Sequence, residues 1–323
     1  MRPPAPGQEI AACFARIRFD PHDAARRLMR ARNSDGGWPY VSGQSWTEVT
    51  ALVVLALRST SVELDHSVMD ACRRGIDWLV TVQRDDGGFA PARAVRESTW
   101  VTSLAALALA SGDTRQRAEH VARWSQAIAW LLTQKPAETS GAIGILQRLL
   151  NTPGSHPPPG GAAWYPGTAA WVAPTAMRIF ALARAAALTG DPIAQHAAEQ
   201  ARNFLLTRRL ADGGWNHGGW YAASEPVTSY PETTGMTLLA LHGLPPETLR
   251  PSLDLAEAAI VHAGSLEAWA WLNMSLIAHN RRAAPEHADA PVEFPARTVR
   301  DLALGILSSN TSSPDNPFTA RPA

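Results

Sequence analysis

The chain has little cysteine and no net charge, and these two shortages exclude several classes of protein. Two cysteines, Cys13 and Cys72, cannot form a disulfide framework, and their spacing is not that of metal ligands. The 29 basic residues balance 29 acidic ones, so electrostatics indicates neither nucleic acid nor an anionic membrane surface as a partner. No apolar run approaches the ~18 residues of a membrane-spanning helix, and residues 1–7 lack an apolar leader segment. We therefore expect a cytoplasmic protein.

An internal repeat is the strongest positive signal in the sequence. Asp-Gly-Gly followed by an aromatic residue occurs three times, ending at Trp38, Phe89 and Trp215. A degenerate copy keeps its two glycines and ends at Trp164. Each copy follows an amphipathic helical pattern and precedes an apolar helical run, so the repeating unit is helix, turn, helix.

A threonine opens the apolar run after every copy of the turn. The four are Thr50, Thr102, Thr175 and Thr234, which lie 13, 14, 14 and 20 residues after the second glycine of their copies. The long fourth spacing marks an insertion, residues 216–224, that is rich in glycine and aromatic residues.

Two kinds of helical pattern alternate along the chain. Residues 66–82 carry one apolar stripe and one polar face, whereas residues 51–57 and 104–110 are apolar on every side. The same alternation continues with outer helices over 193–208 and 247–262 and inner helices over 233–243 and 266–279. An inner ring of buried helices wrapped by an outer ring satisfies both patterns. We predict an all-α protein, an α/α barrel (toroid) of about five to six helical hairpins.

The barrel is expected to be one domain. An N-terminal segment, residues 1–18, precedes it, the barrel spans residues 19–307, and residues 308–323 form a polar, proline-containing tail predicted to be disordered. The Asp-Gly-Gly-aromatic turns themselves have a structural explanation: glycine adopts the left-handed conformation, aspartate caps backbone amides, and the aromatic ring packs onto the hairpin.

The second copy of the repeat resembles a known family. The run Arg74-Gly75-Ile76-Asp77-Trp78-Leu79-Val80-Thr81-Val82-Gln83, followed by Gly87-Gly88-Phe89, is similar to the QW motif of squalene-hopene and oxidosqualene cyclases, with Phe89 in place of the final tryptophan. The resemblance covers roughly residues 20–280 and extends to the terpenoid cyclase and prenyltransferase superfamily. It implies an α/α barrel whose lumen holds an isoprenoid chain.

The motifs that carry chemistry in that superfamily are missing. The sequence has neither the Asp-x-Asp-Asp acid motif of class II cyclases nor the metal-binding Asp-Asp-x-x-Asp of class I synthases. Cys72 falls on an outer helix, so the zinc site of protein prenyltransferases is not expected. We predict no metal and no cofactor.

Aromatic residues next to carboxylates at the starts of inner helices are the candidate site. Glu48 and Glu232 align on the repeat threonines, and Glu97 belongs to a shifted copy, so these three are the candidate catalytic acids. A carboxyl group desolvated among aromatic rings can donate a proton, and ring faces stabilise a carbocation. The alternative is that the glutamates cap their helices. The candidate substrate-binding residues are Trp46, Trp100, Trp164, Trp171, Trp220, Tyr230 and Trp269.

Two functions remain open. The first is an enzyme of the terpenoid cyclase or prenyltransferase type, which acts on an isoprenoid-type substrate by protonation or carbocation guidance. The second is a non-catalytic toroid that binds a lipid or a protein. The expected partner is a hydrophobic small molecule, with peripheral membrane contact kept open, and the sequence does not indicate the oligomeric state. Either function predicts an apolar cavity of roughly 300 to 1,000 Å³ on the barrel axis.

Overall fold

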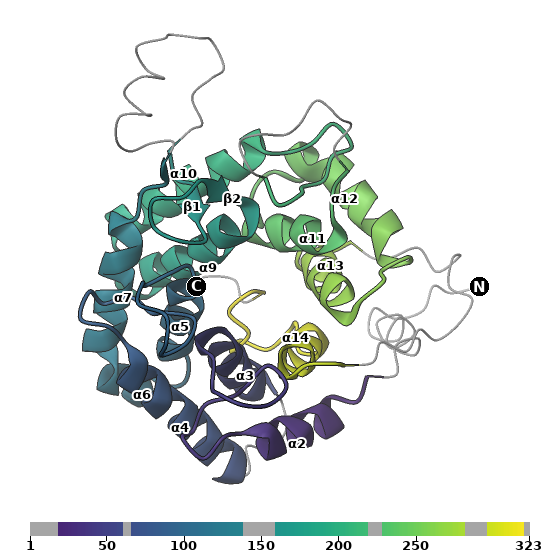
Figure 1. Cartoon of the computed structure of the whole chain (residues 1–323). Helices are drawn as coiled ribbons and strands as arrows, with labels where there is room; N and C mark the ends of the chain where they lie inside the picture. Colours follow the sequence, from purple (N-terminus) through teal and green to yellow (C-terminus); the bar gives the residue numbers. More distant parts are fainter. Residues whose placement is uncertain (1–18, 61–65, 138–158, 219–227, 282–295, 320–323) are drawn as a thin grey trace.

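The structure is a computed structural model that describes residues 19–60, 66–137, 159–218, 228–281 and 296–319. Its helices form two concentric rings (Figure 1). The outer helices are α2 (Pro21–Ala31), α4 (His66–Val82), α7 (Val121–Thr133), α10 (Pro192–Thr207) and α12 (Pro246–Ile260), and a short helix α6 (Thr114–Glu119) precedes α7. The inner helices are α3 (Thr47–Ser59), α5 (Thr102–Leu109), α9 (Val172–Thr189), α11 (Pro231–Ala240), α13 (Leu266–Ala278) and α14 (Val299–Ser309).

The inner ring is closed. Each inner helix packs against the next in chain order, and α14 packs against α3, so the last helix joins the first. A minimal two-stranded sheet, β1 (Ala162–Ala163) antiparallel to β2 (Ala170–Trp171), precedes α9. The predicted α/α barrel with an inner and an outer ring is confirmed. Residues 1–18, the predicted N-terminal segment, lie outside the described residues.

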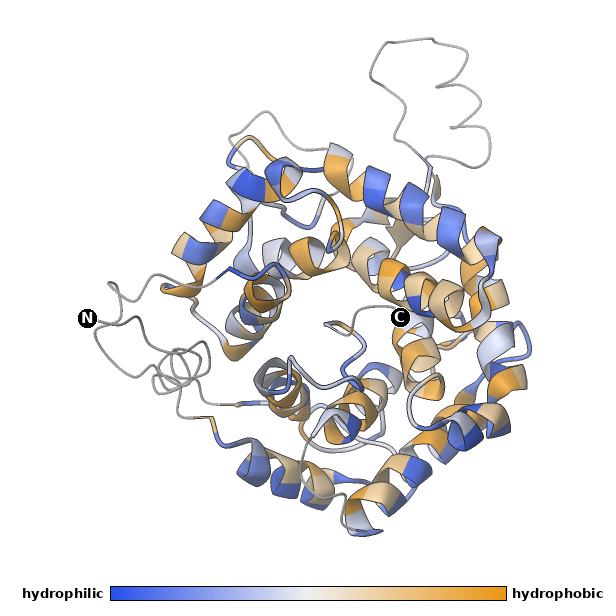
Figure 2. Cartoon of the chain, turned by 180° about the vertical axis from the view of Figure 1, so that it is seen from behind, coloured by the Kyte–Doolittle hydropathy of each residue, from blue (hydrophilic) through white to orange (hydrophobic). Residues whose placement is uncertain are grey.

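Burial explains why the two rings have different sequences. In α3 every residue from Thr47 to Leu57 is buried, whereas α2 buries only Ala24 and Leu28. Figure 2 shows polar residues along the outer helices and apolar ones facing inward. One helix, α9, is long and apolar enough to cross a membrane by length and composition, but two-thirds of it (67%) is buried inside the barrel.

The aspartates of the turns join successive hairpins. Asp35 accepts hydrogen bonds from the amide of Gly37 (3.0 Å), the hydroxyl of Ser45 (2.7 Å) and Nε1 of Trp78 on α4 (2.9 Å). Burial by itself would raise the pKa of Asp35, but these hydrogen bonds outweigh it and lower the pKa. Asp86 repeats the arrangement with Gly88, Ser98 and Trp130. The structural explanation of the turn therefore holds at both copies.

The two glycines of a turn are required for different reasons. Gly36 has a φ of +96°, which a residue with a side chain rarely adopts. At Gly37 the backbone is ordinary, but an added Cβ would lie 2.6 Å from Cβ of Ser45. The repeat threonines fasten the turns to the inner helices, because each hydroxyl accepts a hydrogen bond from the amide that follows the second glycine of its copy; the donors are Trp38, Phe89, Ala162 and Trp215.

The C-terminal tail departs from the prediction. Residues 310–319 form turns that fold back inside the inner ring (Figure 1). Asn316 is fully buried and donates to the carbonyl of Leu307, and the ring of Phe318 packs edge to face against Phe180 (5.1 Å) and Trp271 (5.3 Å). This part of the tail is therefore ordered, because one aromatic side chain anchors it among apolar inner helices; residues 320–323 lie outside the described residues.

Candidate functional site

The starts of the inner helices gather at one end of the barrel, which we call the rim. Hydrogen bonds join neighbouring starts: the Thr47 hydroxyl donates to the carbonyl of Ala90 (2.6 Å), the Trp100 amide to that of Trp164 (3.4 Å), and the Val172 amide to that of His217 (3.0 Å). The second residues of four inner helices are charged: Glu48, Glu232, Glu267 and Arg300. Glu48 and Glu232 thus both lie at the rim.

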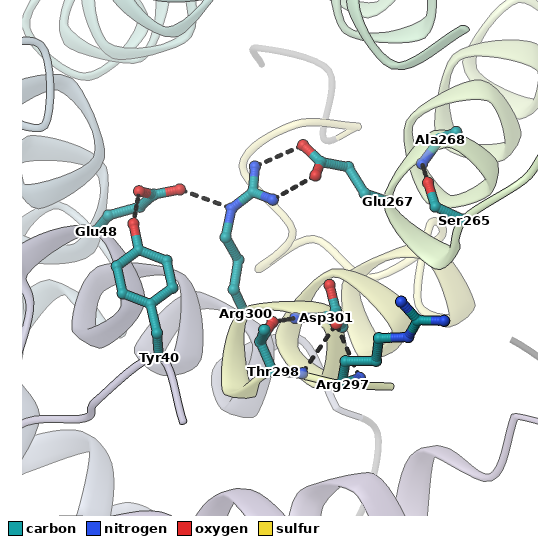
Figure 3. Close-up of polar contacts among 9 residues, drawn as sticks. All are labelled: Tyr40, Glu48, Ser265, Glu267, Ala268, Arg297, Thr298, Arg300 and Asp301. Atoms are coloured by element: carbon teal, nitrogen blue, oxygen red, sulfur yellow. Dashed lines mark hydrogen bonds and ion pairs between the residues drawn. The ribbon is translucent and has the colours of Figure 1, made fainter. Parts of the chain in front are cut away.

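Arg300 links two of these carboxylates (Figure 3). Its Nε donates to Glu48 Oε1 at 2.6 Å, and its two terminal nitrogens donate to the two oxygens of Glu267, each at 2.6 Å. Glu48 also accepts a hydrogen bond from the hydroxyl of Tyr40. The bidentate pair and the single pair fix three inner helices, α3, α13 and α14, to one another.

Residues other than the ion-paired ones cap the N-termini of α13 and α14. Ser265 caps α13 by accepting from the amide of Ala268 (3.1 Å), and Thr298 caps α14 by accepting from the amide of Asp301 (3.0 Å). Because Ser265 caps α13, the carboxylate of Glu267 is available for the ion pair with Arg300. Glu48 likewise binds Tyr40 and Arg300, so it is not a helix cap.

The rim network sets the protonation of its members. Burial would lower the pKa of Arg300, but Glu48 and Glu267 outweigh it and raise the pKa, so the guanidinium is charged. Burial would raise the pKa of Glu267, but the hydrogen bonds and charge of Arg300 outweigh it and lower the pKa. Burial and the charge of Glu48 raise the pKa of Tyr40, so its phenol keeps its proton. The three charges of Glu48, Glu267 and Arg300 sum to −1.

Glu232 differs from the other two rim carboxylates. It is half-buried, and within the described residues no hydrogen bond or ion pair involves it. Tyr230, two residues earlier, is 44% exposed, and its ring lies 4.9 Å from that of His217. Glu232 is therefore the rim carboxylate that is not committed to a basic partner among the described side chains.

The opposite side of the rim is aromatic. Trp100 and Trp164 pack edge to face with ring centroids 4.9 Å apart, and both are half-buried. On the charged side, Trp46 packs in the same way against Tyr40, the hydrogen-bond partner of Glu48, at 5.5 Å. Trp171 is half-buried directly before α9. The rim thus combines a charged arc with an aromatic arc, an arrangement that suits the binding of a cationic or polarisable group.

Three candidates of the sequence analysis lie elsewhere. Glu97 is exposed in the loop before α5 and takes part in none of the rim contacts described above. Trp269 is buried within α13, with 6% of its surface exposed. Trp220 lies outside the described residues.

The lumen differs from the open cavity that was predicted. Phe318 of the tail occupies it between Phe180 and Trp271. One hollow of about 520 Å³ lies on the outside of the second turn, lined by residues such as Gln83, Asp86 and Arg93. Another, of about 30 Å³, lies in the wall between α5, α7 and α9, and neither is lined by the residues around Phe318.

Sequence reasoning missed Tyr40, Glu267 and Arg300. Glu267 and Arg300 follow no Asp-Gly-Gly turn and precede no aligned threonine, so the repeat gave no signal for them. Their partners are distant in sequence: Arg300 lies 252 residues from Glu48 and 33 from Glu267. Among the described side chains, no three of His, Cys, Asp or Glu are grouped to hold a metal ion.

The comparisons with known proteins establish the fold. No protein family model and no curated protein sequence matches the chain. Among solved structures, the type II terpene cyclase MstE from Scytonema, with its product merosterolic acid A, is similar with a TM-score of 0.53 at 19% identity, covering 94% of this chain and 85% of that one.

Two sugar-converting enzymes have the same architecture. The GH76 α-mannanase BT2949 from Bacteroides thetaiotaomicron has a TM-score of 0.58 at 12% identity and covers 91% of this chain and 96% of that one. A sugar epimerase from a ruminal bacterium has a TM-score of 0.52 at 10% identity, covering 88% and 95%. At these identities the likenesses show a shared α/α toroid, and function has to be argued from the site.

Proposed function

We propose that the chain is a terpenoid cyclase-like enzyme that protonates an isoprenoid-type substrate at the rim and guides the resulting carbocation within the barrel. The observation that carries this proposal is the rim itself: a carboxyl group without a described partner, Glu232, at the same end of the barrel as an ion-paired cluster whose formal charges sum to −1. Likeness in fold to a type II terpene cyclase, whose solved complexes hold a geranylgeranyl dihydroxybenzoate substrate, supports it.

Glu232 is the proton donor in this proposal. Glu48 and Glu267 both accept hydrogen bonds from Arg300, so neither side chain is free to reach a substrate. Transfer of the Glu232 proton to a terminal carbon–carbon double bond forms a new C–H bond and leaves a tertiary carbocation. Ring closure then consumes a second double bond, and loss of a proton to water gives a cyclic isomer of the substrate.

The remaining rim residues stabilise the cation. Glu48 and Glu267 exceed Arg300 by one negative charge, and they are partly shielded from solvent, which strengthens their attraction for a positive centre. Trp100 and Trp164 contribute ring faces, whose quadrupole attracts cations. Neither contribution needs a metal ion or an organic cofactor.

A second candidate is a non-catalytic toroid, and both candidates require the tail to leave the lumen. Phe318 occupies space in which a substrate chain would lie, as an internal ligand would. A barrel of this kind would hold a lipid or a protein segment by displacing its own tail. It would bind an isoprenoid without converting it, and this outcome separates the two candidates.

Paired variants test the proposal. Glu232→Gln keeps the shape of the side chain but removes the acid, and Glu97→Gln makes the same change at an exposed loop position that takes part in none of the rim contacts. Purified proteins are incubated with linear isoprenoids, including a prenylated hydroxybenzoate, and products are separated by gas chromatography. We expect turnover in the wild type and Glu97→Gln but not in Glu232→Gln, whose melting temperature shifts by only a few degrees, as for about 1 kcal/mol or less. If Glu232→Gln turns over as fast as the wild type, Glu232 is not the proton donor. If the wild type binds an isoprenoid without converting it, the second candidate is supported.

A further inference from the structure

A second arginine of the inner ring lies buried without an acidic partner among the described residues. Arg178, on α9, is 6% exposed, and its contacts are with the carbonyl oxygens of Gly160 (3.5 Å) and Gly161 (3.4 Å). Its Nε is buried with no hydrogen-bond partner. Burial lowers the pKa of Arg178 to about 10, so the group is still charged at neutral pH. A buried cation without an anion is unfavourable, and a native ligand can relieve that cost.

Arg178 lines the hollow of about 30 Å³ in the barrel wall. The lining residues that the structure describes contain no aspartate or glutamate, but they include Lys135, which is exposed and is the only lysine in the sequence. Thr99 adds a buried hydroxyl that has no hydrogen-bond partner. Two cationic groups and one unused hydroxyl therefore converge where the described chain supplies no negative charge.

The repeat shows that the fold does not need an arginine here. Arg178 lies three residues after the repeat threonine of its copy, and the corresponding positions in the other copies hold Val53, Ala105 and Thr237. All three are buried in inner helices. A small or apolar side chain is thus sufficient for packing at this depth, and the arginine requires another explanation.

The size of the hollow limits the anion. One water needs roughly 10–15 Å³ of such space, so about 30 Å³ matches the two oxygen atoms of a carboxylate group, with the rest of the ligand outside the enclosed space. A guanidinium binds the two oxygens of a carboxylate side by side. Trp100 and Trp130 also line the hollow, which favours an aromatic or apolar group behind the carboxylate.

We infer that the hollow between α5, α7 and α9 is a binding site for a carboxylate ligand, held by Arg178 and Thr99 with Lys135 at its mouth. The site is independent of the acid proposed at Glu232, because it lies in the barrel wall and uses none of the rim carboxylates.

Titration of the full chain with sodium benzoate at constant ionic strength tests this inference. We expect saturable binding by calorimetry in the wild type, at least tenfold weaker binding in Arg178→Met, and a few-fold weaker binding in Lys135→Met. Arg202→Met is the matched control, since Arg202 is a half-buried arginine of the neighbouring outer helix α10 and does not line the hollow; it should bind like the wild type. Equal affinity in Arg178→Met, or no binding by the wild type, overturns the inference. Inorganic phosphate that binds as tightly as benzoate overturns the carboxylate assignment.

A second measurement needs no variant at this position. Because Lys135 is the only lysine, reductive methylation with a ¹³C label gives one side-chain NMR signal besides that of the chain's amino terminus. Benzoate should shift the Lys135 signal and raise the midpoint of its pH titration, since a nearby anion favours the charged amine. A signal that does not respond to saturating benzoate contradicts the site.

Discussion

Two largely buried arginines on inner helices have opposite surroundings. Arg300, with 19% of its side chain exposed, binds two carboxylates, which raise its pKa. Arg178 is surrounded by carbonyl groups and apolar side chains, and burial lowers its pKa. The first charge is compensated within the chain, whereas the second is not compensated by any described residue. The difference indicates that Arg300 holds the rim together and that Arg178 is available to a ligand.

Loss of Arg300 should give the largest effect on stability. Arg300→Met leaves Glu48 and Glu267 as neighbouring carboxylates without their shared cation. We expect the free energy of unfolding at pH 7 to fall by about 3 kcal/mol, at the lower end for breaking a buried ion pair. Urea denaturation measures it, and Arg300→Lys should recover part of the loss. A change of under about 0.5 kcal/mol, as at an ordinary surface position, would show that the bridge is not stabilising.

Replacing Glu267 should destabilise the folded protein by an amount that depends on pH. Glu267→Gln loses half of the bridge, and we expect a cost of about 1–2 kcal/mol at pH 7 for this charged hydrogen bond. Because the pKa of Glu267 is lowered in the folded protein, its contribution is complete above the unfolded value and disappears as pH falls through the folded one. The stabilities of wild type and variant should therefore converge below about pH 4. A gap that is constant down to pH 3 would exclude this linkage.

Replacing Arg178, whose charge no described residue compensates, should stabilise the folded protein instead of destabilising it. Arg178→Met replaces a buried charge with an apolar side chain of similar length, and we expect the free energy of unfolding to rise by about 1 kcal/mol without added anion. Saturating benzoate should reduce or reverse this difference in the free energy of unfolding, because benzoate binds to and stabilises only the wild type. Destabilisation comparable to that of Arg300→Met would mean that Arg178 is already compensated.

The smallest effect should come from Arg202, which lies on the outer helix α10. Its Nε donates to the carbonyl of Ala240 at 3.3 Å. Burial lowers the pKa of Arg202, and the negative charge of Glu199 partly offsets that effect. Arg202→Met should change the free energy of unfolding by no more than about 0.5 kcal/mol, with or without benzoate. A response to benzoate different from that of the wild type would place part of the ligand's effect outside the hollow.

The repeat made most of the fold predictable. The helix predicted over 66–82 is α4 with the same bounds, and the inner helix predicted over 266–279 is α13, which ends one residue earlier. These predictions hold because amphipathic and all-apolar patterns report burial directly. The tail could not be predicted in this way, since a single residue, Phe318, orders a polar segment by packing in the lumen.

The site was only partly predictable. Position at a helix start was enough to place Glu48 and Glu232 at the same end of the barrel, but it could not show that Arg300 commits Glu48 and leaves Glu232 uncommitted. That distinction arises from the closure of the ring, which brings the last helix beside the first. Pairing across such a separation is a tertiary property, and a local sequence pattern does not contain it.

We propose that this barrel protonates an isoprenoid and cyclises it. Incubation of the wild type with a linear isoprenoid in D₂O tests this proposal, because the carboxyl of Glu232 exchanges with solvent and the proton it donates becomes a deuteron. We expect a cyclic product that carries one deuterium, detected by mass spectrometry, and no such product from Glu232→Gln. Recovery of unlabelled linear substrate from the wild type, or an unlabelled cyclic product, would exclude protonation by Glu232.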